Sequence, residues 1–207
     1  MSIITKYKFN QNTYANFIPE FNNGFTYTIT DKTDTDGYTI RTIESDSLPT
    51  LIRFGSTDTS GKGDYTKQQS LLEVNEINTS NVTDMSSMFY QCTGLTYINT
   101  NFDTRLVTNM NSMFNKCSKL TSLDVSNFNT SLVTDMWAMF ANCFKLTSLD
   151  LSNFNTSEVI NMGSMFDSCT LLALLDVSNF NTSSVTDMNS MFYSCSKLTS
   201  LDLSSFN

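Results

Sequence analysis

The sequence is dominated by one segment that returns five times with nearly the same apolar outline. It reads VTDMSSMFYQC at residues 82–92 and VTDMWAMFANC at residues 133–143, and one full period from Val133 is VTDMWAMFANCFKLTSLDLSNFNTSE. Self-similarity at a period of about 20 to 50 residues is typical of repeat arrays, whose units bury their apolar faces against each other. The repeat therefore predicts a stack of units with a continuous core of methionine, phenylalanine and cysteine ladders.

Each repeat combines a helix-like pattern with a strand-like pattern. Val133, Met136, Phe140 and Cys143 follow one another at steps of three, four and three residues, which favours the apolar stripe of a short helix. Polar and apolar residues then alternate over 148–151, as in a strand with one buried face. We therefore predict an α/β solenoid of about five repeats of 25–26 residues, each a short helix plus a strand.

The residues before the repeats differ in kind. FTYTIT and YTIRTI flank the turn-rich DKTDTDG, which indicates a hairpin. We predict a small β-rich module at 1–54, serving as a cap or as an attachment module, then a loop at 55–70 and the repeat array at 71–207. A phosphate-binding loop at GSTDTSGKG is the alternative for this loop, but Lys62 is followed by Gly63 where that motif requires Ser or Thr.

The five cysteines occupy one fixed position of the repeat. Their spacings of 25, 26, 26 and 26 residues differ from the short paired spacings of zinc sites and from small disulfide frameworks. Free cysteine behaves as a small buried hydrophobe. We therefore predict buried thiols at Cys92, Cys117, Cys143, Cys169 and Cys195.

Composition argues against several classes of function. A formal net charge of −8 disfavours association with nucleic acid or anionic lipid. The chain has no histidine, which removes the usual general base and the commonest metal ligand. We predict no enzyme activity, no cofactor and no metal site. The start MSIITKYKFNQ lacks the apolar core of a signal peptide, and no stretch is long and apolar enough for membrane insertion.

The repeat also resembles a known family. MFANCFKLTSLDL and its four relatives are similar to the F-x-x-C-x-x-L-x-x-L/I-x-L/I core of BspA-like leucine-rich-repeat surface proteins, in the variant common in Mycoplasma surface lipoproteins. The resemblance covers about residues 71–207. It implies an α/β leucine-rich-repeat solenoid used for adhesion or recognition at a cell surface, and it supplies no catalytic residues.

Outward positions of the predicted strands are the candidate ligand-binding residues. Strands that stack about 4.8 Å apart would align these positions in columns. One predicted column is acidic, with Asn99 in place of the acid in the first full repeat, and its members are Glu73, Asn99, Asp124, Asp150, Asp176 and Asp202. A solvated stripe, a contact surface for a cationic or polar partner, and calcium coordination remain alternatives for the acidic column. The candidate residues are Glu73, Tyr97, Asn99, Ser122, Asp124, Ser148, Asp150, Leu174, Asp176, Ser200 and Asp202.

An Asn-Thr-Ser triplet recurs where each repeat is expected to bend. It matches the N-glycosylation pattern at Asn78, Asn129, Asn155 and Asn181. Because Asn and Ser side chains also satisfy backbone groups in turns, we favour turn formation as the reason for the triplet.

Together, these patterns predict a non-catalytic extracellular recognition or adhesion protein that binds a protein or glycan on a cell surface through its repeat face. The alternative is a phage or phage-like tail component located in the virion tail, with the N-terminal module attached to the particle. A third hypothesis is a structural assembly element. The array reaches LDLSSFN without a polar cap, which predicts self-association or a continuing chain at this end.

Overall fold

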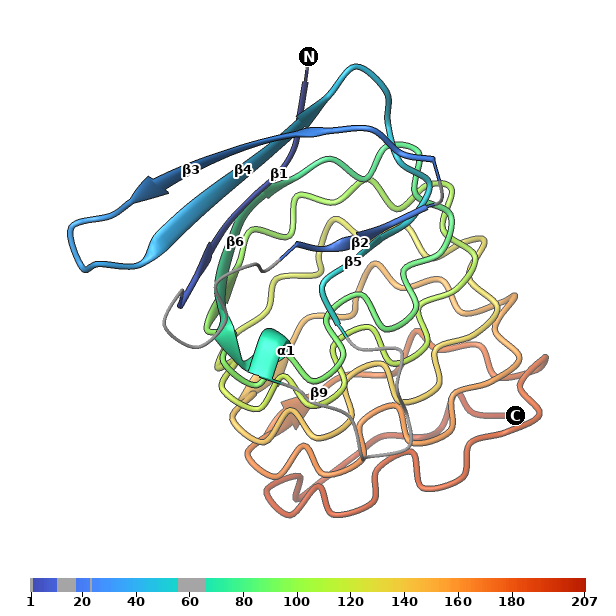
Figure 1. The fold of residues 1–207 in the computed structure, drawn as a ribbon. Coiled ribbons are helices and arrows are strands. Elements are labelled where there is room, and N and C mark those ends of the chain that lie inside the picture. The colour runs from blue at the N-terminus through green and yellow to red at the C-terminus, as the bar shows by residue number, and fades with distance from the viewer. Residues whose placement is uncertain (1, 11–17, 23, 56–65) are drawn as a thin grey trace.

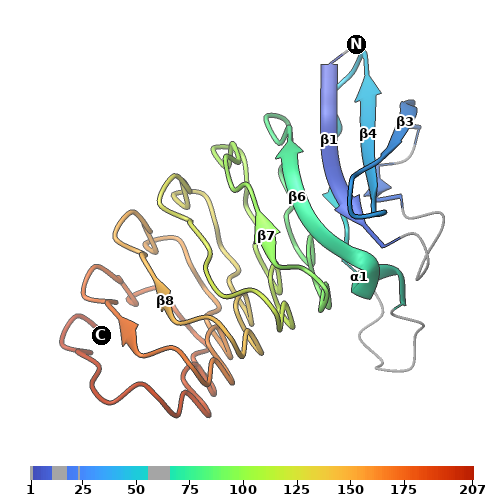
Figure 2. The same ribbon diagram turned by 90° about the vertical axis from the view of Figure 1, so that its left-hand side faces the viewer.

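The computed structural model describes residues 2–10, 18–22, 24–55 and 66–207. The N-terminal strands lie at one end of a stack of repeats and the C-terminus lies at the other (Figures 1 and 2). The elements are β1 (Ser2–Phe9), β2 (Glu20–Phe21), β3 (Thr28–Thr33), β4 (Thr39–Ser45), β5 (Ile52–Arg53), α1 (Thr66–Ser70), β6 (Leu71–Ile77), β7 (Tyr97–Ile98), β8 (Ser148–Leu149) and β9 (Leu174–Leu175).

A five-stranded sheet joins the N-terminal segment to the first repeat strands. Its order is β3-β4-β1-β6-β7, and β1 pairs antiparallel with both β4 and β6. The side chains of β4 alternate between buried and half-buried, as expected for a strand with one face on the core. Hydrogen bonds along β1 and β6 therefore hold the N-terminal strands against the repeats.

The predicted loop at 55–70 contains the short helix α1 at its end. The alternative of a phosphate-binding loop at 55–63 falls almost wholly on 56–65, outside the described residues.

The predicted α/β leucine-rich-repeat solenoid is wrong. Among the residues that the structure describes, α1 is the only α-helix, and the segments predicted as helices are chains of tight turns. The predicted strands are equally reduced, since β7, β8 and β9 have two residues each and the sheets are small. The described residues lie almost entirely in strands, turns and loops.

Hydrogen bonding explains why the turns replace helices. An α-helix requires each amide to donate to the carbonyl four residues earlier. In the first repeat, the Met88 amide instead donates to the Met85 carbonyl at 3.2 Å, three residues back, while the Ser87 amide donates to Asn111 in the next repeat at 2.8 Å. Amides thus alternate between their own turn and the neighbouring repeat.

The alternation requires two left-handed residues in each repeat. Ser87 and Gln91 have φ angles of 55° and 62°, and Ala138 and Asn142 have φ angles of 51° and 59°. Left-handed backbone costs roughly 1–2 kcal/mol for residues with a β-carbon. Hydrogen bonds to the next repeat offset this cost, so the turn geometry depends on stacking.

Parallel pairing keeps the repeats in register. The bridges link residues that occupy the same position in successive repeats, and the positions carry aspartate and asparagine in alternation. The bridged residues are Asp84, Asn109, Asp135, Asn161 and Asp187.

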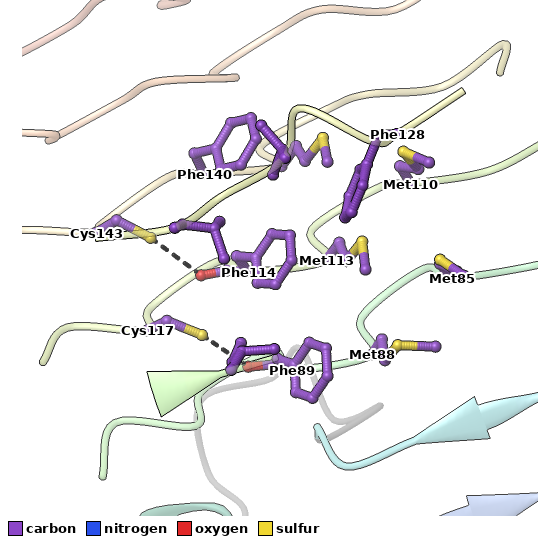
Figure 3. Packing of buried hydrophobic residues seen from close by; sticks show 14 of the residues in the cluster. Met85, Met88, Phe89, Met110, Met113, Phe114, Cys117, Phe128, Phe140 and Cys143 are labelled. Carbon is purple, nitrogen blue, oxygen red and sulfur yellow. Dashed lines mark hydrogen bonds between the residues drawn. The ribbon is translucent and has the colours of Figure 1, made fainter. Parts of the chain in front are cut away.

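A phenylalanine stack runs through the core. The rings of Phe89 and Phe114 are 5.5 Å apart between centroids, and those of Phe114 and Phe140 are 5.9 Å apart (Figure 3). Phe54 from the N-terminal segment extends the stack, with its ring 5.5 Å from that of Phe89. The N-terminal segment therefore covers the first face of the core with an aromatic ring of its own.

All five cysteines are described, and they are buried thiols outside any disulfide, as predicted. The Cys117 thiol donates to the Phe89 carbonyl at 3.2 Å, and the Cys143 thiol donates to the Phe114 carbonyl at 3.2 Å (Figure 3). Each of these carbonyls also accepts the amide of the cysteine in its own repeat. The thiol thus supplies a second donor to a buried carbonyl, and this explains the fixed position of cysteine in the repeat.

Alkylation should follow this burial. Burial raises the pKa of the Cys117 and Cys143 thiols well above the usual value, so the reactive thiolate is scarce at pH 8. We expect iodoacetamide to modify Cys143 roughly 100-fold more slowly in the native protein than in urea, because modification requires local opening. Cys195, which is 9% exposed, should react first. Peptide mass spectrometry over time measures these rates, and equal labelling of all five native thiols would contradict the buried ladder.

Candidate functional site

The predicted binding residues form one surface along the repeats, which we call the strand surface. Ser148 aligns with Leu174 in the β8–β9 pair. Glu73 aligns with Tyr97 in the β6–β7 pair, so its predicted alignment with Asn99 and the aspartates is wrong. Glu73 is half-buried, with its carboxylate 3.7 Å from the Lys8 ammonium. The other ten are exposed: Tyr97, Asn99, Ser122, Asp124, Ser148, Asp150, Leu174, Asp176, Ser200 and Asp202.

Each aspartate of the strand surface holds a turn. Asp124 Oδ1 accepts the Ser126 amide at 2.9 Å and the Ser126 hydroxyl at 2.6 Å. These two bonds hold the pKa of the Asp124 carboxyl below its usual value, because they favour the charged form. The amides of Ser152, Ser178 and Ser204 make the same contact with the aspartate two residues earlier. Sequence reasoning missed this role, although Asp followed by Ser two residues later is a known turn pattern.

Asn99 shows that this turn does not need a charge. Its Oδ1 accepts the Asn101 amide at 3.3 Å, in the position that aspartate occupies in the later repeats. By contrast, Asp and Asn alternate along the column of residues joined by the parallel bridges, from Asp84 to Asp187, so a neutral amide lies between successive carboxylates there. Four successive repeats of the strand surface therefore carry a carboxylate at a position where an amide could form the same turn. These residues are Asp124, Asp150, Asp176 and Asp202.

These carboxylates lie close enough to repel each other. Asp124 and Asp176 both act to raise the pKa of Asp150, but the hydrogen bonds from Ser152 outweigh them and the pKa of Asp150 is lowered. The column is therefore ionised at neutral pH despite the mutual repulsion.

The Asn-Thr-Ser triplets form hydrogen bonds between neighbouring repeats. The Thr130 hydroxyl donates to the Asn155 carbonyl at 2.8 Å and accepts the Asn155 amide at 2.8 Å. Asn129 Oδ1 accepts the Ser131 amide at 3.0 Å. The structure supports the turn interpretation of the triplet, since both the asparagine and the threonine side chains are engaged in backbone contacts.

Two polar pockets lie at the first end of the strand surface. One, of about 280 Å³, is lined by residues that include Glu76, Asn78, Asn99 and Asn101. The other, of about 230 Å³, is lined by residues that include Asn99, Asn101 and Asp124. The structure thus brings the predicted residues Asn99 and Asp124 together, and it adds Asn101, which sequence reasoning did not single out.

The described residues contain no group of three or more His, Cys, Asp or Glu side chains placed to hold a metal ion. Within the same part of the chain, no helix has the length and apolar character needed to cross a membrane.

Comparison with known families identifies the repeats. The family described as "Mycoplasma protein of unknown function, DUF285" matches residues 62–170 and 145–207, which together cover more than half of the chain. The chain belongs to the DUF285 family. No curated protein and no solved structure matches the chain. DUF285 membership confirms the Mycoplasma-associated part of the resemblance, while the leucine-rich-repeat part is not supported by the structure.

Proposed function

We propose that this DUF285 protein is a non-catalytic recognition or adhesion protein at a cell surface, and that it binds a protein partner through the strand surface. The observation that carries the proposal is the run of four consecutive carboxylates at Asp124, Asp150, Asp176 and Asp202, where Asn99 shows that an amide holds the same turn. Retained charge that the fold does not need favours a role in binding.

The chemistry of the strand surface suits a basic protein partner. Its carboxylates complement lysine and arginine side chains, and complementary charge accelerates encounter and selects among partners. Tyr97 and Leu174, at 52% and 75% exposure, add apolar contact area next to the charges. Tyr97 and Leu174 occupy the position that Ser122, Ser148 and Ser200 hold in the other repeats, so two of the five repeats depart from serine at this position. Aromatic and apolar groups beside polar ones are typical of protein interfaces.

The family supports a surface location. The Mycoplasma association of DUF285 and the resemblance of the repeat to BspA-like surface proteins both favour display outside the cell. Under this proposal the protein would need no catalytic set and no cofactor.

The test neutralises charge while keeping the turns. The variant carries Asp150→Asn and Asp176→Asn, since asparagine forms the same turn at Asn99. The matched control is Asp135→Asn, because Asn109 and Asn161 occupy that column position in the adjacent repeats. Binding to a panel of basic cell-surface and matrix proteins is measured by biolayer interferometry at several salt concentrations.

We expect the double variant to bind about tenfold more weakly than the native protein, with a reduced dependence on salt, and the control to bind normally. Thermal unfolding should change little in either variant. The proposal is wrong if no basic protein binds the native chain, or if the double variant binds as tightly as the native chain.

A further inference from the structure

The tryptophan of this chain occupies an unusual position in the repeat. Two residues after each bridged Asp or Asn, the successive repeats carry Ser86, Asn111, Trp137, Gly163 and Asn189. Trp137 is the single tryptophan of the chain and is 39% exposed. This position lies outside the strand surface, in the turn segment of the repeat.

Gly163 makes room for the indole ring. A β-carbon at Gly163 would lie 3.0 Å from Trp137 Cδ1, so the indole ring lies against the next repeat at this glycine. Gly163 is not among the glycines with positive φ, so the backbone does not require glycine here. Glycine in place of a side chain weakens the folded state through its larger unfolded entropy. Trp137 and Gly163 thus both differ from the residues at the same position in the other repeats. Together they allow a partly exposed indole ring to pack against the next repeat.

Hydrogen-bonding groups lie next to the glycine that the indole ring contacts. Asn161 Oδ1 and Asp187 Cγ both lie 3.3 Å from the position of a β-carbon at Gly163. Asp135 is occupied, since its oxygens accept the Trp137 amide at 2.9 Å and Asn111 Nδ2 at 3.1 Å. Asp187 uses Oδ1 for the Asn189 amide at 2.8 Å. Within the described part of the chain, the Trp137 indole N–H and Asp187 Oδ2 have no hydrogen-bond partner. This leaves one donor on the ring and one acceptor on the carboxylate next to Gly163.

From this arrangement we propose that Trp137, Gly163 and Asp187 form a binding platform for a neutral saccharide. The apolar face of a sugar ring would stack on the indole, which offers a flat apolar surface with a polar edge. Sugar hydroxyls both donate and accept, so they match the indole N–H and the Asp187 carboxylate at once. An anionic ligand would be repelled by Asp135 and Asp187, and an ammonium group could not accept the indole N–H bond.

The single tryptophan allows a direct test, because its fluorescence reports on this position alone. The native protein is screened on an array of neutral oligosaccharides of glucose, galactose, mannose and N-acetylglucosamine, with sialylated and sulfated glycans as anionic probes. Neutral glycans that bind are then titrated while the tryptophan emission is recorded. The variants are Trp137→Asn, which places the residue of Asn111 and Asn189 at this position, and Gly163→Asn, which fills the space under the ring. Phe144→Ala removes another exposed aromatic ring of the same repeat and is the control.

We expect at least one neutral glycan to bind and to shift the emission, and both Trp137→Asn and Gly163→Asn to weaken array binding at least tenfold while Phe144→Ala binds normally. Circular dichroism should confirm that the variants keep the native fold. The Asp150→Asn and Asp176→Asn variant should bind the glycan normally, which separates this platform from the strand surface. The proposal is overturned if only anionic glycans bind, if no glycan binds, or if Trp137→Asn binds as the native protein does.

Discussion

Replacing Gly55 by alanine is expected to detach the N-terminal segment from the first repeat and to lower the free energy of unfolding by about 3 kcal/mol or more. A β-carbon at Gly55 would lie 2.2 Å from the Ser87 carbonyl oxygen and 2.3 Å from the Tyr90 nitrogen. Both atoms belong to the backbone, so no side-chain rotation relieves the clash. The Phe54 and Gly55 amides, which donate to the Met88 carbonyl at 2.7 and 2.8 Å, would lose their acceptor.

Urea unfolding gives the change in stability, and hydrogen exchange at the Phe54 and Gly55 amides reports on detachment. Gly37→Ala is the matched control, because nothing lies within 4 Å of its β-carbon position while its φ of 80° costs only about 1 kcal/mol. Equal losses for the two substitutions would contradict the predicted clash with the first repeat, because Gly55 does not have a positive φ and the clash is the only reason for a larger loss there.

Phe140→Ala is expected to lower the free energy of unfolding by about 3–5 kcal/mol, the range for truncating a buried aromatic side chain. Its ring is fully buried and lies 5.9 Å from that of Phe114 and 5.7 Å from that of Phe166. Removing it opens a cavity between two rings and interrupts the phenylalanine stack. Because repeats are stabilised mainly by their neighbours, the loss should also broaden the unfolding transition.

Phe192→Ala and Phe144→Ala are the comparisons for this substitution. Phe192 is only partly buried and has one phenylalanine ring against it, at 5.6 Å from Phe166, so its truncation should cost less than that of Phe140. Phe144 is 41% exposed, and its truncation should cost under about 1 kcal/mol. Chemical denaturation followed by circular dichroism measures all three. Similar losses for Phe140 and Phe192 would contradict a stack that stabilises the protein from its centre.

The repeat predicted correctly which side chains are buried, but it did not predict the backbone conformation of the buried segments. The step of three, four and three residues from Val133 to Cys143 reports which side chains point inward, and all four are buried. The same steps suit a helix and a chain of tight turns, because both bring every third or fourth side chain to one side. The choice between them depends on whether Ser87 and its equivalents find acceptors in the next repeat, and those acceptors lie about 24 residues away.

The candidate site was predicted only in part. The period placed Asp124, Asp150 and Asp176 in one exposed column, as the structure has them. Their turn bonds to the following serines and the pocket that joins Asn99 to Asp124 were missed. The pocket depends on how the first repeats lie against each other, which no local pattern contains. The platform at Trp137 was missed as well, because its seat at Gly163 belongs to the following repeat.

The repeat period alone was enough to predict which side chains are buried, which residues of successive repeats align and which family the chain resembles, since a fixed period places equivalent residues at equivalent positions. The backbone conformation between the buried positions depends on contacts between repeats that are distant in the chain. Non-glycine residues such as Ala138 adopt left-handed angles because hydrogen bonds to the next repeat offset the local cost. The N-terminal strands were likewise placed by pairing at a distance, where β1 meets β6 more than sixty residues along the chain.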